Sequence, residues 1–496
     1  MKIGWAKVDV TPAGPCMLAG QMYARLATSV LDPLNATVLA LESGNEKVIM
    51  ISLDSVGFRQ PVLDAVRNKI SKTTGVPPMN IIGFATHTHT APQCGEVIPK
   101  EYWTSNPTMW GSFRGNIGID IDEIRKKHPD FVDSRQYADF LMEKLTRAAQ
   151  EAWDKRAPGK IAYGQGSAAV GECRRLVMKG KGGVMYAQED SPGFLNVEGH
   201  VDHTLGVMAT YTPDGKLTGL VINTACPSQV CAAWSVVSAD FWHDVRQTVA
   251  ERWGKDVFIL PQCSAAGDMS PNVLVNRNAD QRMMILRGQM KEPLPDWSWK
   301  TRSRTPAYCM ARRMEIARRI RLALEDVLGV IGKTADSRIG MKTFSKTLQL
   351  PPRKITEQEY KNAIASAEKL RADMKQNGEL YDGTLLWHLR VVDRYEHPRK
   401  SIPMVMHVIR VGNAVFATNS FELYLDYGDR IKAYSKADQT FLIQLTAGGN
   451  GTGSYLPSPR SGGSGYGSAP ASSTVSYEAG DIIVQETTQA IADLFR

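Results

Sequence analysis

Two histidines follow an apolar, β-branched run near residue 85 of this 496-residue chain. The stretch Asn80-Ile-Ile-Gly-Phe-Ala-Thr-His-Thr-His-Thr-Ala-Pro92 predicts a strand that leads into His87 and His89. Residues two apart in a strand share a face, so both imidazoles are expected on one side where the strand stops. Strand ends are common ligand sites, and histidine titrates nearest to neutral pH. The spacing fits a metal site, acid–base catalysis, or two solvated side chains.

Other side chains that could take part in catalysis or binding also follow apolar strands. Asp54 is either an active-site group or a helix or turn cap. Small residues after the strand over 256–260 permit a tight turn that presents Asp268 and Ser270. Glu422 stands just beyond the last strand pair of the chain.

The elements that must position these groups alternate between strands and helices. Strands are predicted over 3–10, 36–41, 47–53, 80–85, 159–164, 217–224, 256–260, 402–411 and 414–418. Helices are predicted over 62–72, 134–153, 307–328, 356–376 and 477–495, the fourth with a capping box formed by Thr356 and Glu359. This order predicts an α/β fold with a mixed β-sheet core flanked by helices. Because no compositional linker divides the chain, residues 1–496 are expected to form one domain.

Two long loops invite a functional interpretation. The region 101–130 carries Tyr102, Trp103, Trp110 and Phe113, which suit either a lid or binding loop, or packing under a lid. The region 447–473 is dense in glycine and serine, a composition typical of flexible linkers. Since a strand precedes it and a helix follows it, we expect an ordered active-site loop instead.

Composition narrows the class of protein. Apolar residues make up 43% and charged residues 22%, as in soluble globular proteins. The net charge of +8 comes from interspersed residues, which favours a solvated basic surface over an anionic substrate or a membrane surface. No nucleic-acid module and no transmembrane run are found, and the start of the chain has no signal-peptide pattern. Seven scattered cysteines favour reduced thiols, so a cytoplasmic location is expected.

Seven short motifs follow one another along the chain: Val8-Asp-Val-Thr-Pro12, Ala85-Thr-His-Thr-His-Thr-Ala-Pro92, Cys173-Arg-Arg175, Asn223-Thr-Ala-Cys226, Ser238-Ala-Asp240, Gly267-Asp-Met-Ser-Pro-Asn272 and Phe421-Glu422. In this order they resemble the neutral/alkaline, non-lysosomal ceramidase family. The second and the sixth are the most specific. The resemblance covers nearly the whole chain at the level of the family's catalytic domain, and the C-terminal immunoglobulin-like domain of larger ceramidases is expected to be absent.

The resemblance implies a zinc hydrolase that cleaves the amide bond of an N-acyl sphingoid base. It implies metal ligation by His87, Glu422 and Tyr455, with His89 as the acid/base. Arg174 and Tyr466 would bind the oxyanion, and Asp268 and Ser270 lie in the family's catalytic turn, where Ser270 would position the attacking group or be the nucleophile. A catalytic zinc with three protein ligands keeps one position for water, whose pKa falls to about 7, so these roles are chemically coherent.

One position departs from the family pattern. The family places a second zinc-binding histidine, in an A-C-H-P context, where this chain reads Ala225-Cys226-Pro227-Ser228. Either another side chain replaces it, or the site binds a different metal weakly, or it binds none. The candidate replacements are His243, Cys226, Asp54 and His203. A ligand set with one histidine and a tyrosine makes a poorer zinc site than one with two histidines.

These observations leave three functions open. The first is a metal-dependent hydrolase acting on a ceramide-like or other N-acyl substrate, either a lipid or a small molecule. The second is a carbohydrate-active enzyme on the same fold, because the tryptophan-rich loop and the arginines suit a soluble glycoside or sugar derivative. The third is a binding protein without a metal.

Overall fold

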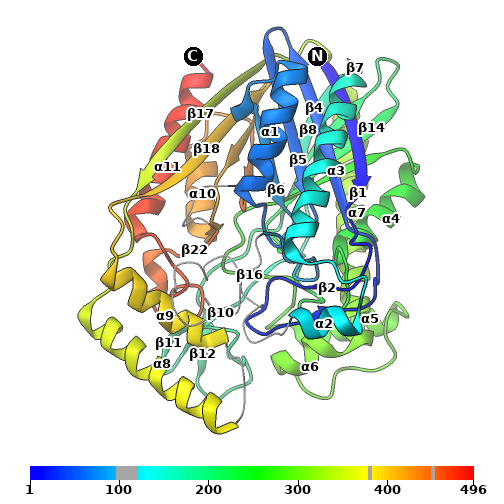
Figure 1. The fold of residues 1–496 in the computed structure, drawn as a ribbon. Coiled ribbons are helices and arrows are strands. Elements are labelled where there is room, and N and C mark those ends of the chain that lie inside the picture. Colours follow the sequence, from blue (N-terminus) through cyan, green and yellow to red (C-terminus); the bar gives the residue numbers. More distant parts are fainter. Residues whose placement is uncertain (96–120, 378–382, 448–452) are drawn as a thin grey trace.

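The computed structural model describes residues 1–95, 121–377, 383–447 and 453–496 (Figure 1). Tyr102, Trp103, Trp110 and Phe113 of the proposed lid loop lie outside these residues. Part of the region predicted as loop is helical, because α2 (Ile121–Lys127) begins where the description resumes. In the described residues no helix is long and apolar enough to cross a membrane.

The N-terminal third builds a mixed sheet covered by two helices. Its order is β6-β5-β4-β1, with the short β7 (Ala157–Pro158) beyond β1. In this sheet β4 pairs antiparallel with both β1 and β5, and β6 is parallel to β5. The elements are β1 (Lys2–Asp9), β4 (Asn35–Ser43), β5 (Glu46–Leu53), α1 (Gln60–Thr74), β6 (Ile81–Ala85) and α3 (Ser134–Asp154).

The same connectivity occurs twice more along the chain. The second sheet has the order β15-β14-β13-β8, and the third has the order β21-β19-β18-β17. In each, three antiparallel strands are followed by a helix and by a fourth strand parallel to the third. The second set is β8 (Lys160–Ser167), β13 (Thr204–Tyr211), β14 (Leu217–Thr224), α4 (Phe241–Trp253), β15 (Phe258–Cys263) and α7 (Pro306–Ile331). The third set is β17 (Met341–Leu350), β18 (Ile402–Val411), β19 (Ala414–Thr418), α10 (Leu425–Tyr434), β21 (Gln439–Ile443) and α11 (Tyr477–Leu494).

We call these three βββαβα segments unit 1 (residues 2–154), unit 2 (160–331) and unit 3 (341–494). In each unit one sheet face packs on the unit's own helices, as Leu141 and Leu145 of α3 do against the first sheet. The opposite faces of all three sheets meet in one shared core, which contains Trp5, Met208 and Phe416. Burial on both faces explains why these strands read as nearly continuous apolar runs in the sequence.

Insertions extend the units at one edge of the sheets. Since the first, third and fourth strands of a unit run in the same direction, the segments that follow them leave from the same edge. In Figure 1 these insertions gather in the lower half, away from the two termini. They hold β2 (Cys16–Met17), β3 (Leu26–Ala27), β9 (Glu172–Cys173), β10 (Arg175–Met178), β11 (Gly182–Met185), β12 (Phe194–Val197), β16 (Met269–Ser270), α5 (Arg277–Leu286), α6 (Trp299–Arg304), α8 (Glu357–Asn377), α9 (Gly383–Glu396), β20 (Glu422–Leu423) and β22 (Tyr455–Leu456).

The predicted fold class is confirmed, since the structure is a mixed α/β protein with helix-covered sheets. The predicted strands over 217–224, 402–411 and 414–418 match in both boundaries. The predicted capping box also forms, because the Glu359 carboxylate accepts from Thr356 N at 2.9 Å and the Thr356 hydroxyl accepts from Glu359 N at 3.2 Å. The sequence interpretation did not include β13, β17, α9 or α10.

Candidate active site

His87 lies just beyond β6, in a backbone conformation rare for a residue with a side chain. Its φ is 67°, and its ring is buried. The prediction that a strand places both histidines on one face is wrong, because β6 ends at Ala85. The left-handed turn instead brings the two rings into an edge contact, with 5.0 Å between the centroids of His87 and His89.

The two ring nitrogens of His87 face different partners. Nδ1 lies 2.6 Å from the carbonyl oxygen of Val56, and since a carbonyl only accepts, Nδ1 carries the proton of that bond. Nε2 lies 3.3 Å from Oε2 of Glu422. A carboxylate facing an imidazole nitrogen at this distance requires positive charge between them, either a proton or a metal ion.

The loop that carries His89 is anchored on both sides. The hydroxyls of Thr88 and Thr90 donate to the Ser238 carbonyl at 3.0 and 2.8 Å. Arg25, which is buried, donates to the carbonyl of His89 at 2.6 Å. Gly20 packs against the imidazole so closely that a Cβ there would lie 2.4 Å from the ring. Substitution at Gly20 would therefore displace His89.

Arg174 forms the centre of the site and is 2% exposed. Its Nη1 donates to the Tyr186 hydroxyl and, at 3.1 Å, to Oε1 of Gln229. Its Nη2 donates to the Gly267 carbonyl at 3.0 Å and to the Tyr455 hydroxyl at 3.1 Å. Burial alone would lower the pKa of this guanidinium, but the neighbouring tyrosines and Glu422 raise it, so Arg174 is a fixed cation.

Glu422 and Tyr455 are direct neighbours on the short parallel pair β20–β22. Burial would raise the pKa of Glu422, but His87, Arg174 and Tyr455 together lower it, and Oε2 lies 3.7 Å from Arg174 Nη2. Burial and the Glu422 charge raise the pKa of Tyr455 well above its ordinary value. The carboxyl is therefore ionised at neutral pH and the phenol keeps its proton.

Three more aromatic rings surround this group. Tyr466 meets Tyr455 edge to face at 5.3 Å between centroids, and it lies 5.6 Å from Trp387 of α9. Tyr186, whose hydroxyl accepts from Arg174, has a φ of 64°. The insertions of units 2 and 3 thus supply an aromatic wall beside the buried arginine.

The structure does not bring Ser270 or the carboxylate of Asp268 into this group. The Ser270 hydroxyl accepts from Asn272 N at 3.2 Å, and within the described residues it forms no hydrogen bond to either histidine. The Asp268 carboxylate accepts from Leu425 N at 3.1 Å and pairs with Arg460 at 3.3 Å. The preceding Gly267 packs its backbone against the Glu422 carbonyl, leaving no space for a Cβ. The turn over residues 267–272 therefore packs between the insertions of units 2 and 3.

The residues that the family resemblance implies for a metal do converge. Two ligands, each about 2 Å from a tetrahedral zinc, lie about 3.3 Å apart, which matches the separation of His87 Nε2 and Glu422 Oε2. Among the residues that the structure describes, His87 Nε2 is buried without a hydrogen bond, and its Nδ1 is held by a carbonyl, as in metal-ligating histidines. The Tyr455 hydroxyl interacts with the same carboxylate. The three side chains fit a divalent cation as an N,O,O set.

The proposed substitutes for the missing histidine do not join this set. Cys226 donates to the Val170 carbonyl, and Asp54 forms a two-pronged ion pair with Arg246 at 2.7 and 3.0 Å. No group of three His, Cys, Asp or Glu side chains suited to a metal occurs in the described parts of the chain. The loop after β14 instead contributes Gln229, which contacts Arg174 and His89.

Sequence reasoning missed Gln229 and Tyr186. Gln229 carried a positional signal, since it stands close to the substituted histidine. Tyr186 carried none, because its role depends on the hairpin β10–β11 folding back over Arg174.

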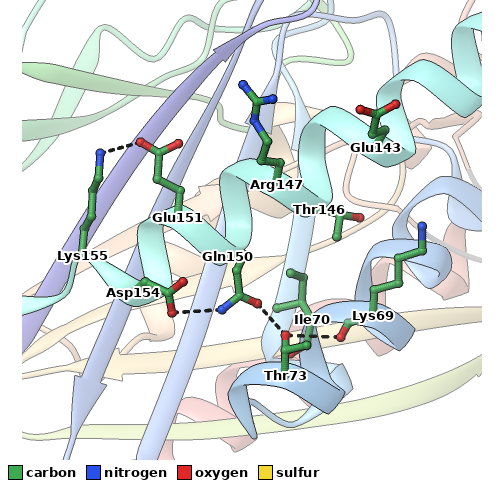
Figure 2. Close-up of a pocket in the computed structure, with 10 residues that line it drawn as sticks. All are labelled: Lys69, Ile70, Thr73, Glu143, Thr146, Arg147, Gln150, Glu151, Asp154 and Lys155. Atoms are coloured by element: carbon green, nitrogen blue, oxygen red, sulfur yellow. Dashed lines mark hydrogen bonds and ion pairs between the residues drawn. The ribbon is translucent and has the colours of Figure 1, made fainter.

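A shallow groove on the outer surface is separate from the site (Figure 2). It has a volume of about 670 Å³ and lies between α1 and α3, where Thr73 donates to Gln150 at 2.5 Å and Lys155 to Glu151 at 2.6 Å. Its lining side chains are mostly charged or polar, and they include none of the candidate site residues.

Comparison with known proteins shows which solved structures have a similar fold. No family model and no curated protein sequence matches the chain. The solved structure of neutral ceramidase from Pseudomonas aeruginosa superposes with a TM-score of 0.64 at 14% identity, covering 99% of this chain and 74% of that one. A second solved structure, a ceramidase complexed with C2, gives a TM-score of 0.62 at 13% identity, with 99% and 75% covered. The chain therefore has the mixed α/β fold of the neutral ceramidases.

Proposed function

We propose that this protein is a hydrolase that cleaves the amide bond of an N-acyl, ceramide-like substrate. The observation that carries the proposal is the meeting of His87, His89, Arg174, Glu422 and Tyr455 in one buried group at the edge where the three units converge. A ceramidase-like fold supports the reaction class, and the residues supply the chemistry.

Arg174 is suited to stabilise the oxyanion of a tetrahedral intermediate. It is a buried cation held by four acceptors, so it needs no reorganisation during the reaction. Its Nε is buried and donates no hydrogen bond within the described residues, which leaves one N–H for a substrate oxygen. Tyr466, whose ring packs on that of Tyr455, is the second candidate donor.

His89 is positioned for proton transfer. It is partly exposed, unlike His87, and its ring contacts that of His87. We assign it the transfer of a proton from the attacking water to the leaving amine. A divalent metal, which His87, Glu422 and Tyr455 would hold, would polarise the carbonyl and lower the pKa of a bound water.

The test is amine release from a short-chain N-acyl sphingosine and from simple N-acyl amines. The matched variant is His89→Gln, which keeps the size and polarity of the side chain but cannot exchange a proton. We expect turnover by the wild type and a loss of about 10²-fold or more in the variant. Folded, metal-supplemented wild type that releases no amine would refute the proposal, and cleavage confined to glycosides would favour the carbohydrate-active alternative.

A further inference from the structure

Gln229 links the buried arginine to the proton-transfer histidine. The side chain is 7% exposed and follows β14 in unit 2. Its Oε1 accepts from Arg174 Nη1 at 3.1 Å, and its Nε2 lies 3.0 Å from His89 Nε2. Because arginine has donors only, the Gln229 oxygen must face it. The amide N–H₂ must then face His89.

This orientation determines the role of one imidazole nitrogen. An amide N–H₂ is a donor, so His89 Nε2 must accept and must carry its lone pair. We propose that Gln229 is a positioning residue that, backed by Arg174, keeps His89 as the tautomer with its proton on Nδ1. If Nε2 carried the proton, its N–H would face the amide N–H₂, and two donors cannot form a hydrogen bond. Rotating the amide by half a turn would remove that conflict but would place its N–H₂ opposite Arg174, which also only donates.

The tautomer matters for the reaction proposed above, on which the catalytic meaning of this inference rests. Because the amide contacts Nε2 directly at 3.0 Å and Nδ1 already carries a proton, the ring can take up a further proton only at Nε2, and it gives up the amide contact when it does. Gln229 would thus determine which ring nitrogen of His89 takes up a proton, without itself touching the substrate.

A merely structural role for Gln229 predicts something different. If the side chain only ties Arg174 to the loop, any residue of similar length that binds Arg174 should serve. Gln229→Glu preserves the bond to Arg174 but presents a second acceptor to His89, whereas Gln229→Met preserves length and removes both bonds. The two variants therefore separate tethering from control of the tautomer.

The decisive measurement is nitrogen NMR of protein labelled with ¹⁵N-histidine, at one fixed pH, with the His89 signals assigned by their loss in His89→Gln. We expect a protonated Nδ1 and an unprotonated Nε2 in the wild type, and a protonated Nε2 in Gln229→Glu. A wild-type Nε2 that carries a proton, or a Gln229→Glu spectrum identical to the wild type, would overturn the inference. Unchanged His89 signals in Gln229→Met would do the same.

Kinetics give the second readout. With the amide substrate we expect Gln229→Glu to lower kcat by about 10²-fold, with KM changed by less than about threefold. Equal kcat in the wild type and Gln229→Glu would overturn the catalytic part of the inference. The NMR result does not depend on turnover, so failure of the amide screen and failure of this inference are distinguishable.

Discussion

At the scale of single residues, backbone strain marks the site. His87 and Tyr186 are non-glycine residues with positive φ, at 67° and 64°, and each contacts the group around Arg174. Such conformations cost of order 1 kcal/mol or more and persist where surrounding contacts determine them. Here the Val56 carbonyl and the Arg174 guanidinium supply those contacts. Two of the four non-glycine residues with positive φ in the described part of the chain therefore lie at the candidate site, and the other two are Asp240 and Leu445.

His87→Asn should remove bound metal without unfolding the protein. Asparagine tolerates a left-handed backbone better than most residues, so it is a milder change here than alanine. We expect metal content, measured by elemental mass spectrometry, to fall from near-stoichiometric to background. His397→Asn, at an exposed histidine, is the control. Equal metal in both variants would remove His87 from the ligand set.

The sequence predicted some of these residues and not others. His87, His89 and Glu422 stand in or beside recognisable motifs, and the structure brings them together. The prediction that His87 and His89 share one face of a strand failed because β6 ends at Ala85 and a left-handed turn orients His87. For Gln229 the only signal was its place near the substituted histidine, and for Tyr186 there was none, since the contacts of both residues with Arg174 form only in the folded chain.

At the scale of elements, side chains from other parts of the chain help to hold the glycine-rich segment, in addition to its β20–β22 pairing and its own turns. The expectation of an ordered loop is confirmed for residues 453–473, within the described part of the chain. Arg175 donates to the carbonyls of Ser464 and Tyr466, each at 3.1 Å, and Arg394 donates to the carbonyl of Pro470. Composition alone could not reveal these donors, because they come from β10 and α9.

Arg394→Gln should loosen this segment selectively. Losing a half-buried cation that binds the Pro470 carbonyl should speed amide hydrogen exchange over residues 453–473, while β18 and β19 stay protected. The control is Arg338→Gln, since the side chain of Arg338 is 89% exposed. Uniform acceleration across the protein would instead indicate a global loss of stability.

Helix α7 carries a buried carboxylate whose effect on stability depends on pH. Glu315 is fully buried in α7, and although burial would raise its pKa, hydrogen bonds from Arg318 and Arg319 lower it to about 2. A depressed pKa stabilises the fold above the ordinary value of about 4.3, and the contribution is lost as the pH falls toward 2.

Glu315→Gln should therefore destabilise the protein by roughly 2 kcal/mol at pH 7. The difference from the wild type should shrink below pH 4, because the wild-type carboxyl is then being protonated too. Urea unfolding at pH 7 and at pH 3 measures both values. A difference that is constant between the two pH values would show that the ion pairs contribute nothing.

At the scale of the whole molecule, each of the three units supplies part of the candidate site. Unit 1 provides His87 and His89, unit 2 provides Arg174 and Gln229, and unit 3 provides the carboxylate of Glu422. These side chains meet because the strand ends that carry them reach the same edge around the shared core.

Fragments 1–337 and 338–496 should regain function only together. The chain between units 2 and 3 is exposed at Ser337 and Arg338, so a break there should be tolerated. We expect neither fragment alone to bind metal or release amine, and the co-expressed pair to do both. Activity of the first fragment alone would show that unit 3 is dispensable.

Since the same strand order occurs in three units and each unit supplies part of the candidate site, the docking of every unit should affect activity. A molecule with any one unit misdocked keeps most of its secondary structure yet should lose its catalytic power entirely, because no remaining pair of units encloses the buried arginine with both its carboxylate and its histidines. The specific activity of a preparation would then measure the fraction of correctly assembled molecules rather than the total amount of folded protein. Partially folded species would be inactive rather than weakly active.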